Sequence, residues 1–96
     1  MEEINLIPTA DICRFHEVDY SFISLLNEAG LIIFREINHT TFISDNELGK
    51  LEKMIRLHRE LEINVAGIET INYLLDRIVQ MQEEMRVLKN RVKAQN

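Results

Sequence analysis

The last third of the chain carries an uninterrupted heptad pattern, and this feature constrains the fold most. No proline occurs from Val65 onward, so a single helix of up to about 29 residues, about 43 Å long, is expected there. Its apolar residues recur at the two core positions of a heptad: Ile71, Ile78, Met85 and Val92 at one, and Leu74, Met81 and Leu88 at the other. This pattern is typical of a coiled-coil helix.

The residues that precede this helix are too few to cover an apolar face of such length. Near its start, Ile68, Ile71 and Leu75 are expected to pack on the rest of the chain. Beyond them the helix must stand exposed or pair with a second chain. We therefore predict a homodimer that forms through Ile78, Met81, Met85, Leu88 and Val92. The heptad alone leaves the orientation of the two helices open, because the two methionines weaken the preference for a parallel pair.

Capping residues predict two short helices in the first third of the chain. Thr9 is placed to cap a helix that ends near Glu17, and Asp19 to cap a second one that runs to Gly30, where a left-handed residue is expected. The tight connection between the two predicts a helix-turn-helix.

Two further helix starts follow. Ser44 and Glu47 match the S-x-x-E capping box, and Asn64 is placed to cap the long helix after a break near residues 62–64. We therefore divide the chain into a winged helix-turn-helix domain, residues 1–62, and an association helix, residues 63–96.

A β-hairpin is expected between the second and third helices. Residues 31–34 and 40–43 are β-branched or aromatic, and Asn38-His39 supplies turn residues between them. A two-stranded hairpin directly after a helix-turn-helix is a wing. Only three Gly and one Pro occur in 96 residues, so the expected fold class is mainly α, with this small wing and a long C-terminal helix.

The third helix has an apolar and a basic side. Leu48, Leu51, Met54, Ile55, His58 and Leu61 share one side and are expected to pack on the first two helices. The other side carries Lys50, Lys53, Arg56 and Arg59, interleaved with acids. A solvated face is favoured there over a nucleic-acid contact.

Catalytic and metal-binding patterns are not found in the sequence. Cys13 is adjacent to Ile12 and is expected to be a packed thiol, and the three histidines have no metal-ligand spacing. No glycine-rich phosphate loop occurs. We therefore expect a protein that is not an enzyme and has no cofactor or metal. The single cysteine and the lack of a signal-like or membrane-spanning segment favour the cytoplasm.

The charge is divided unequally along the chain. Residues 1–49 hold two arginines and nine acids, a net charge of −7, whereas residues 50–96 carry +2. Acidic residues repel a phosphate backbone and attract a basic partner.

The order of these motifs, from Asp19 through Gly30, a wing and Ser44, resembles the winged helix-turn-helix of MerR-type regulators. Ser24, Leu25 and Leu26 stand where those regulators usually have an arginine followed by aromatic residues. A closer resemblance is to the CbpM-type chaperone modulators, a MerR-like offshoot. It rests on residues 30–32 and 35–37, on 41–43, and above all on the stretch R-L-H-R-E-L-E-I-N-V-A-G-I at 56–68. Phe34 stands where that family often has a proline.

The CbpM resemblance implies a protein that binds the J-domain of a DnaJ-like, CbpA-type co-chaperone and inhibits its action on DnaK. J-domains present a basic helix to DnaK, which an acidic domain would match. The expected interface residues are Glu17, Asp19, Tyr20, Glu28 and Glu36. MerR-like relatives pair their terminal helices in antiparallel fashion, so that orientation is expected here. The alternative function is a MerR-type DNA-binding transcriptional regulator.

Overall fold

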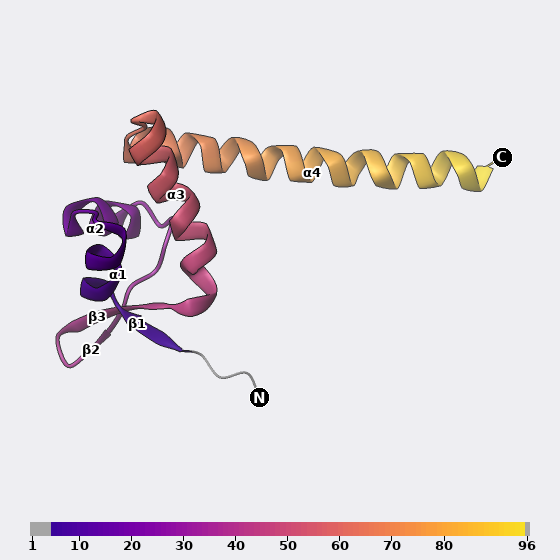
Figure 1. Cartoon of the computed structure of the whole chain (residues 1–96). Helices are drawn as coiled ribbons and strands as arrows, with labels where there is room; N and C mark the ends of the chain where they lie inside the picture. Colours follow the sequence, from indigo (N-terminus) through magenta and orange to yellow (C-terminus); the bar gives the residue numbers. More distant parts are fainter. Residues whose placement is uncertain (1–4, 96) are drawn as a thin grey trace.

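The computed structural model describes residues 5–95 and has a mainly α-helical fold with a small sheet (Figure 1). The elements in chain order are β1 (Leu6–Pro8), α1 (Thr9–His16), α2 (Tyr20–Glu28), β2 (Arg35–Ile37), β3 (Thr40–Ser44), the 3₁₀ turn η1 (Asp45–Glu47), α3 (Leu48–Leu61) and α4 (Val65–Gln95). The elements before α4 form one body, and α4 projects away from it, so the molecule measures 60 × 39 × 20 Å. The predicted fold class, a winged helix-turn-helix with a long C-terminal helix, is confirmed.

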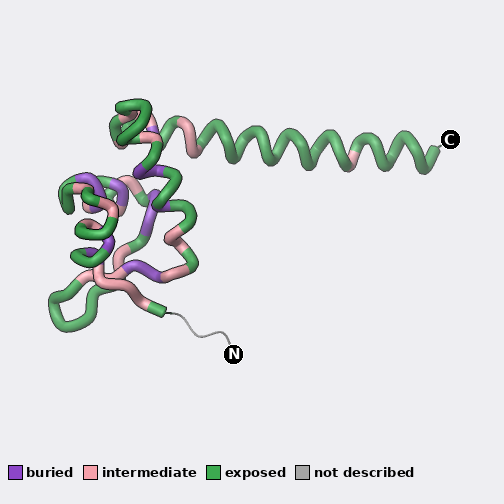
Figure 2. The backbone as a smooth tube through the Cα atoms, viewed as in Figure 1, coloured by how far each residue is buried: buried purple, intermediate pink, exposed green. Residues whose placement is uncertain are grey.

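The core lies where α2, α3, β3 and the first turn of α4 meet (Figure 2). The most completely buried side chains are Ile23, Leu26, Ile32, Ile43, Leu51 and Ile68. Each contributes about 1.5–3 kcal/mol by leaving water. Because Ile68 is 1% exposed, the start of α4 is anchored in the core and its direction is set by the body.

The sheet has three antiparallel strands in the order β1-β3-β2. The predicted turn is confirmed, because Asn38 and His39 both have positive φ, 51° and 65°, as a tight hairpin turn requires. The predicted first strand, residues 31–34, is wrong: the strand is residues 35–37. Leu31 and Ile32 are 4% and 1% exposed, so their apolar side chains fill the core instead.

The third strand, β1, was not expected from the sequence. Leu6 pairs with Ser44 and Pro8 with Phe42 along the outer edge of β3. Three residues that end in a proline carry no strand periodicity, so only their partner strand gives them this conformation. The wing hairpin of β2 and β3 is thus extended to a three-stranded sheet.

The first two helices form the predicted helix-turn-helix, with one difference at the start. The N-cap of α1 is Pro8, not Thr9. The hydroxyl of Thr9 instead forms hydrogen bonds with the Thr41 hydroxyl, at 2.5 Å, and the Thr41 carbonyl, at 3.3 Å. The prediction of Thr9 as a cap was therefore wrong, because a bond to β3 competes with the local one.

The ends of α2 agree with the sequence pattern. Asp19 occupies the N-cap position, although its side chain makes no capping bond there, and its carbonyl accepts the amide of Phe22 at 3.1 Å. Gly30 has a φ of 77°, the left-handed conformation expected after a helix. The amide of Leu31 then donates to the Leu26 carbonyl at 2.9 Å, which directs Leu31 into the core.

The two later helix starts differ in outcome. The predicted capping box at Ser44 and Glu47 is wrong: residues 45–47 form a 3₁₀ turn, α3 begins at Leu48, and Ser44 makes no side-chain capping bond. Asn64 is confirmed as a cap, since its Oδ1 accepts the amide of Gly67 at 2.9 Å. The break at residues 62–64 is also confirmed, with Glu62 in the left-handed region at a φ of 55°.

Candidate functional site

A polar hollow lies at the turn between α1 and α2 and is lined by this turn, α2 and α3. Glu17 and Asp19 line it together with Phe22, His58 and Arg59, and its volume is about 280 Å³. The Arg59 guanidinium donates hydrogen bonds to the carbonyls of His16 and Glu17, a favourable place for a cation because α1 ends there. Arg59, one of the four bases of α3, is therefore engaged within the protein.

The third predicted interface residue, Tyr20, packs at the start of α2. Its ring lies 6.0 Å from that of Phe34, with the planes tilted by 33°. The amide of Phe34 donates to the Asn27 side chain at 2.9 Å, which holds the segment before the wing against α2. Tyr20 is 48% exposed, so half of its ring remains available to a partner.

Glu28 and Glu36 lie apart from that turn. Glu28 ends α2, and Glu36 lies in β2, where its carboxylate is 3.9 Å from Nδ1 of His39. All five predicted interface residues are exposed, but only Glu17 and Asp19 share one hollow. The structure therefore distributes these residues over the turn, α2 and the wing.

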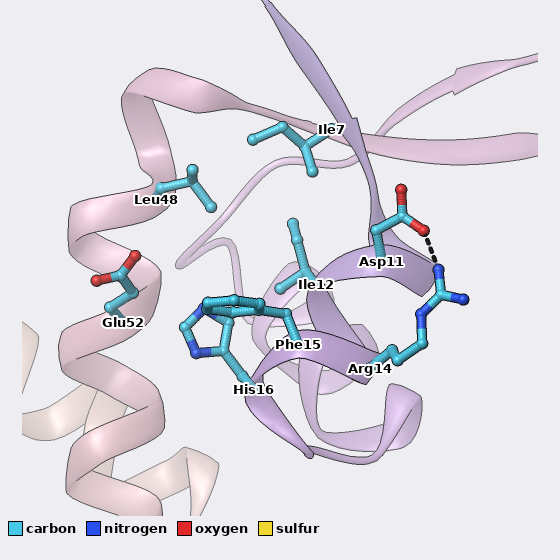
Figure 3. A pocket seen from close by; sticks show the side chains of 8 residues that line it. All are labelled: Ile7, Asp11, Ile12, Arg14, Phe15, His16, Leu48 and Glu52. Carbon is cyan, nitrogen blue, oxygen red and sulfur yellow. Dashed lines mark hydrogen bonds and ion pairs between the residues drawn. The ribbon is translucent and has the colours of Figure 1, made fainter.

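A groove between α1 and α3 was missed by sequence reasoning (Figure 3). We call it the α1–α3 groove; its volume is about 530 Å³. The apolar side chains of Ile7, Ile12, Phe15 and Leu48 line it, with Asp11 and Glu52 among its polar residues. Phe15 is 82% exposed. The available signal was the i, i+3 spacing of Ile12 and Phe15, which places both on one face of α1.

The charged residues of α3 are divided between its two sides. Lys50 and Lys53 line a small hollow of about 90 Å³ with Ile68 and Leu75 of α4, whereas Glu52 lines the α1–α3 groove. Lys50 and Lys53 therefore face α4, whereas Glu52 faces α1. The alternation of bases and acids in the sequence did not reveal this separation.

The predicted apolar side of α3 is only partly correct. Leu51, Met54 and Ile55 are buried and Leu48 packs against the core, but Leu61 is 64% exposed. The helix ends at Leu61 and the chain turns away at Glu62, so no element covers that last side chain. His58 lies at the surface, and one face of its ring packs on Phe22.

The heptad residues of α4 are uncovered in the single chain. Ile78, Met81, Met85, Leu88 and Val92 are each 48% to 58% exposed. Ile71 is half-buried. Leu75 is 55% exposed but lines a hollow with Lys50 and Lys53 of α3, so its expected packing on the body is confirmed only in part. Because α4 projects away from α3 (Figure 1), the cover that α3 gives to the apolar face of α4 is incomplete at Leu75.

Within residues 5–95 we looked for a reactive nucleophile and for a metal site. Cys13 is half-buried, and burial, with the nearby charge of Asp19, raises the pKa of its thiol. No group of three or more His, Cys, Asp or Glu side chains in this range is placed to hold a metal ion. Nor is any helix of this range long and apolar enough to cross a membrane.

Comparison with known proteins gives one match. A family model described as MerR HTH family regulatory protein matches residues 7–90, which span β1 through most of α4. Searches of curated proteins and of solved structures find no match.

Proposed function

The chain belongs to the MerR HTH regulatory protein family, and on this premise we propose that it is a non-enzymatic modulator that binds the J-domain of a DnaJ-like, CbpA-type co-chaperone. Binding would restrain the action of that co-chaperone on DnaK. The CbpM-like stretch at residues 56–68 supports this choice within the family. In the structure this stretch spans the end of α3, the break and the start of α4.

One observation carries the proposal: the turn and second helix of the helix-turn-helix lack the positive charge that a DNA reader needs, and Arg14 of α1 is ion-paired with Asp11. Residues 15–34 contain no lysine or arginine, and Glu17, Asp19 and Glu28 are exposed there. Approach to a phosphate backbone would cost electrostatic repulsion without releasing counterions. The same surface is complementary to a basic helix, and such complementarity increases the association rate and selectivity.

Calorimetric titration with the J-domain encoded in the same genome tests the proposal. We expect saturable binding that Glu17→Lys and Asp19→Lys each weaken by about tenfold, with a smaller dependence on salt. Asp76→Asn, on exposed α4, is the matched control and should leave the affinity unchanged. No binding of the unmodified protein would refute the function.

The second candidate function is a MerR-type DNA-binding regulator. Family membership favours it, as do the exposed Lys50, Lys53 and Arg56 on α3. The DNA-binding function requires affinity for duplex DNA that falls steeply with salt, and loss of that affinity in Lys53→Glu. Saturable binding of a genomic fragment by the protein at low salt, without J-domain binding, would decide for this candidate.

The proposed modulator is a homodimer that pairs through the heptad face of α4. Its charge distribution supports an antiparallel arrangement. Residues 65–84 hold four acids and one base, whereas residues 85–96 hold four bases and no acid. Antiparallel pairing places the basic end of one helix beside the acidic half of the other, while parallel pairing places like charges together.

A spin label at position 94 tests the orientation. Ala94→Cys is labelled in a Cys13→Ser background, and the distance between the two labels of a dimer is measured. Antiparallel pairing separates the labels by much of the helix length. Labels within about 25 Å, two helix diameters side by side, would indicate parallel pairing instead.

A further inference from the structure

The α1–α3 groove is a mostly apolar hollow of about 530 Å³, and none of the predicted interface residues lines it. We propose that this groove is where the partner docks, taking the apolar side chains of a basic amphipathic helix. This inference rests on the proposed function and assigns it a site: the J-domain's basic helix would lie between α1 and α3, with Phe15 as its main contact. The groove ends at His16, directly before Glu17, so the basic side chains of the same helix would reach the acidic turn, which is why Glu17→Lys and Asp19→Lys are also expected to weaken binding.

The apolar part of the argument is the position of Phe15. Its side chain is 82% exposed, although it lies beside Ile12, which is 4% exposed and belongs to the core. Figure 3 shows the ring of Phe15 between α1 and Glu52 of α3. Aromatic side chains with few rotatable bonds lose little entropy when covered, and they provide much of the affinity at protein interfaces.

The size of the groove fits side chains of a helix. Its volume of about 530 Å³ falls within the range of about 300–1,000 Å³ typical of binding clefts. The groove is floored by Ile7, Ile12 and Leu48 from three elements whose positions the core determines. It therefore needs little rearrangement when a helix enters, which lowers the cost of binding.

The charges at the groove select the basic helix. Arg14 is ion-paired with Asp11, so its charge is already balanced. Glu52, at the facing wall, is in no ion pair within residues 5–95 and is exposed. Lys50 and Lys53 line the opposite side of α3. A lysine or arginine beside the apolar residues of the entering helix would meet Glu52, whereas a phosphate would be repelled.

The basic end of α4 in a second copy of the chain is also a basic amphipathic helix and could enter the groove. Its apolar residues are the heptad positions Met85, Leu88 and Val92, and these are needed for the α4 pair. A separate partner is therefore the favoured occupant, and self-docking is an outcome that the test distinguishes.

The test compares Phe15→Ser, Glu52→Lys and a matched control in calorimetric titrations of the full chain with the J-domain. The control, Ile33→Ser, also removes an exposed apolar side chain, 65% exposed, outside the groove. We expect Phe15→Ser to weaken binding at least tenfold, Glu52→Lys to weaken it severalfold and to reduce its salt dependence, and Ile33→Ser to have no effect. Circular dichroism checks that each variant is folded.

The possible failures are distinguishable. If the unmodified protein binds but Phe15→Ser and Glu52→Lys bind equally well, the groove is refuted and the function stands. If the unmodified protein does not bind, the function and the groove proposal both fail. If Phe15→Ser lowers the mass of the free protein in light scattering, the groove is occupied by a second copy, which also overturns the proposal. Amide chemical shifts on J-domain addition give a second readout, expected on α1 and α3.

Discussion

The imidazole of His58 stacks on the ring of Phe22, with ring centroids 4.2 Å apart and planes 18° apart. Its Nδ1 also lies 3.0 Å from the carbonyl oxygen of Ile63. This one side chain of α3 therefore contacts both α2 and the break before α4. The angle at which α4 leaves the body depends on this contact and on the burial of Ile68.

The His58 contact predicts a measurable loss of stability. His58→Ala should lower the free energy of unfolding by about 1–2 kcal/mol, because the aromatic contact and the bond to Ile63 are both removed. Urea denaturation followed by circular dichroism measures this. Arg56→Ala, exposed on the same helix, is the control and should change stability little. Equal effects of the two substitutions would contradict the structural role of His58.

Asn64, which caps α4, and Ser44, whose side chain makes no capping bond, should respond differently to alanine. Asn64→Ala removes the bond to the Gly67 amide and should cost about 1 kcal/mol. Ser44→Ala should leave stability unchanged or raise it, because the Ser44 hydroxyl is buried without a hydrogen-bond partner among the described residues. Thermal unfolding of both variants gives the comparison. A loss in Ser44→Ala as large as that in Asn64→Ala would restore the capping box that the structure lacks.

Two helical glycines should differ when replaced by alanine. At Gly49 an added Cβ meets nothing within 4 Å, so Gly49→Ala should stabilise α3 by about 1 kcal/mol through helix propensity. At Gly67 the Cβ would lie 2.7 Å from Cγ2 of Ile63 and 3.3 Å from Oδ1 of Asn64. Gly67→Ala should therefore destabilise the protein, as measured by urea denaturation. If both substitutions stabilise the protein, the Ile63 side chain can move away from the added Cβ of residue 67, and the predicted clash is refuted.

The thiol of Cys13 should be protected in the folded state. Burial, and secondly the charge of Asp19, raise its pKa, so less thiolate is present at a given pH and alkylation is slower than in the unfolded chain. Iodoacetamide labelling at pH 8, with and without urea, measures this by mass spectrometry. Asp19→Asn should accelerate the reaction only partly, since burial remains. Equal rates in buffer and urea would contradict the burial.

The same pKa shift has a defined sign for stability. A group whose pKa is raised on folding stabilises the native state fully below its unfolded pKa, and this contribution is lost as the pH rises through the folded pKa. Cys13 should therefore lower stability only in the alkaline range, and Cys13→Ser should remove that part of the alkaline dependence.

The heptad face of α4 predicts a dimer that one charge should dissociate. Met81→Glu places a carboxylate on the face that we propose to pair, and light scattering should then report the mass of a single chain. Asn90→Glu, on the opposite side of the helix by heptad position, is the matched control and should remain dimeric. An unchanged mass for Met81→Glu would exclude this face as the dimer interface.

Several elements were predictable because their signals are local. Asn64 bonds an amide three residues away, and Gly30 adopts a positive φ that other residues resist. The heptad predicts a helix from spacing alone, and α4 extends over 31 residues. In each case the residue and its partner are neighbours in the chain.

Other features could not be predicted from the sequence, because they depend on contacts between segments that are distant in the chain. Thr9 bonds Thr41 rather than capping α1, and β1 exists only because β3 pairs with it. Leu31 and Ile32 have strand propensity but are buried in the core. Among the interface candidates, sequence reasoning found exposed acids on several elements, whereas the α1–α3 groove brings residues 7, 15 and 48 together from three elements.

The sequence by itself determined the helical class, the order of the elements, the acidic first half and the long apolar seam of α4, because periodicity, capping and charge are properties of neighbouring residues. Only the tertiary structure decided that Glu52 of α3 lies in the groove with α1, that Lys50 and Lys53 lie beside α4, and that Phe15 lies exposed in an open groove. The physical reason is that exposure depends on what packs against a side chain, and those partners come from elsewhere in the chain.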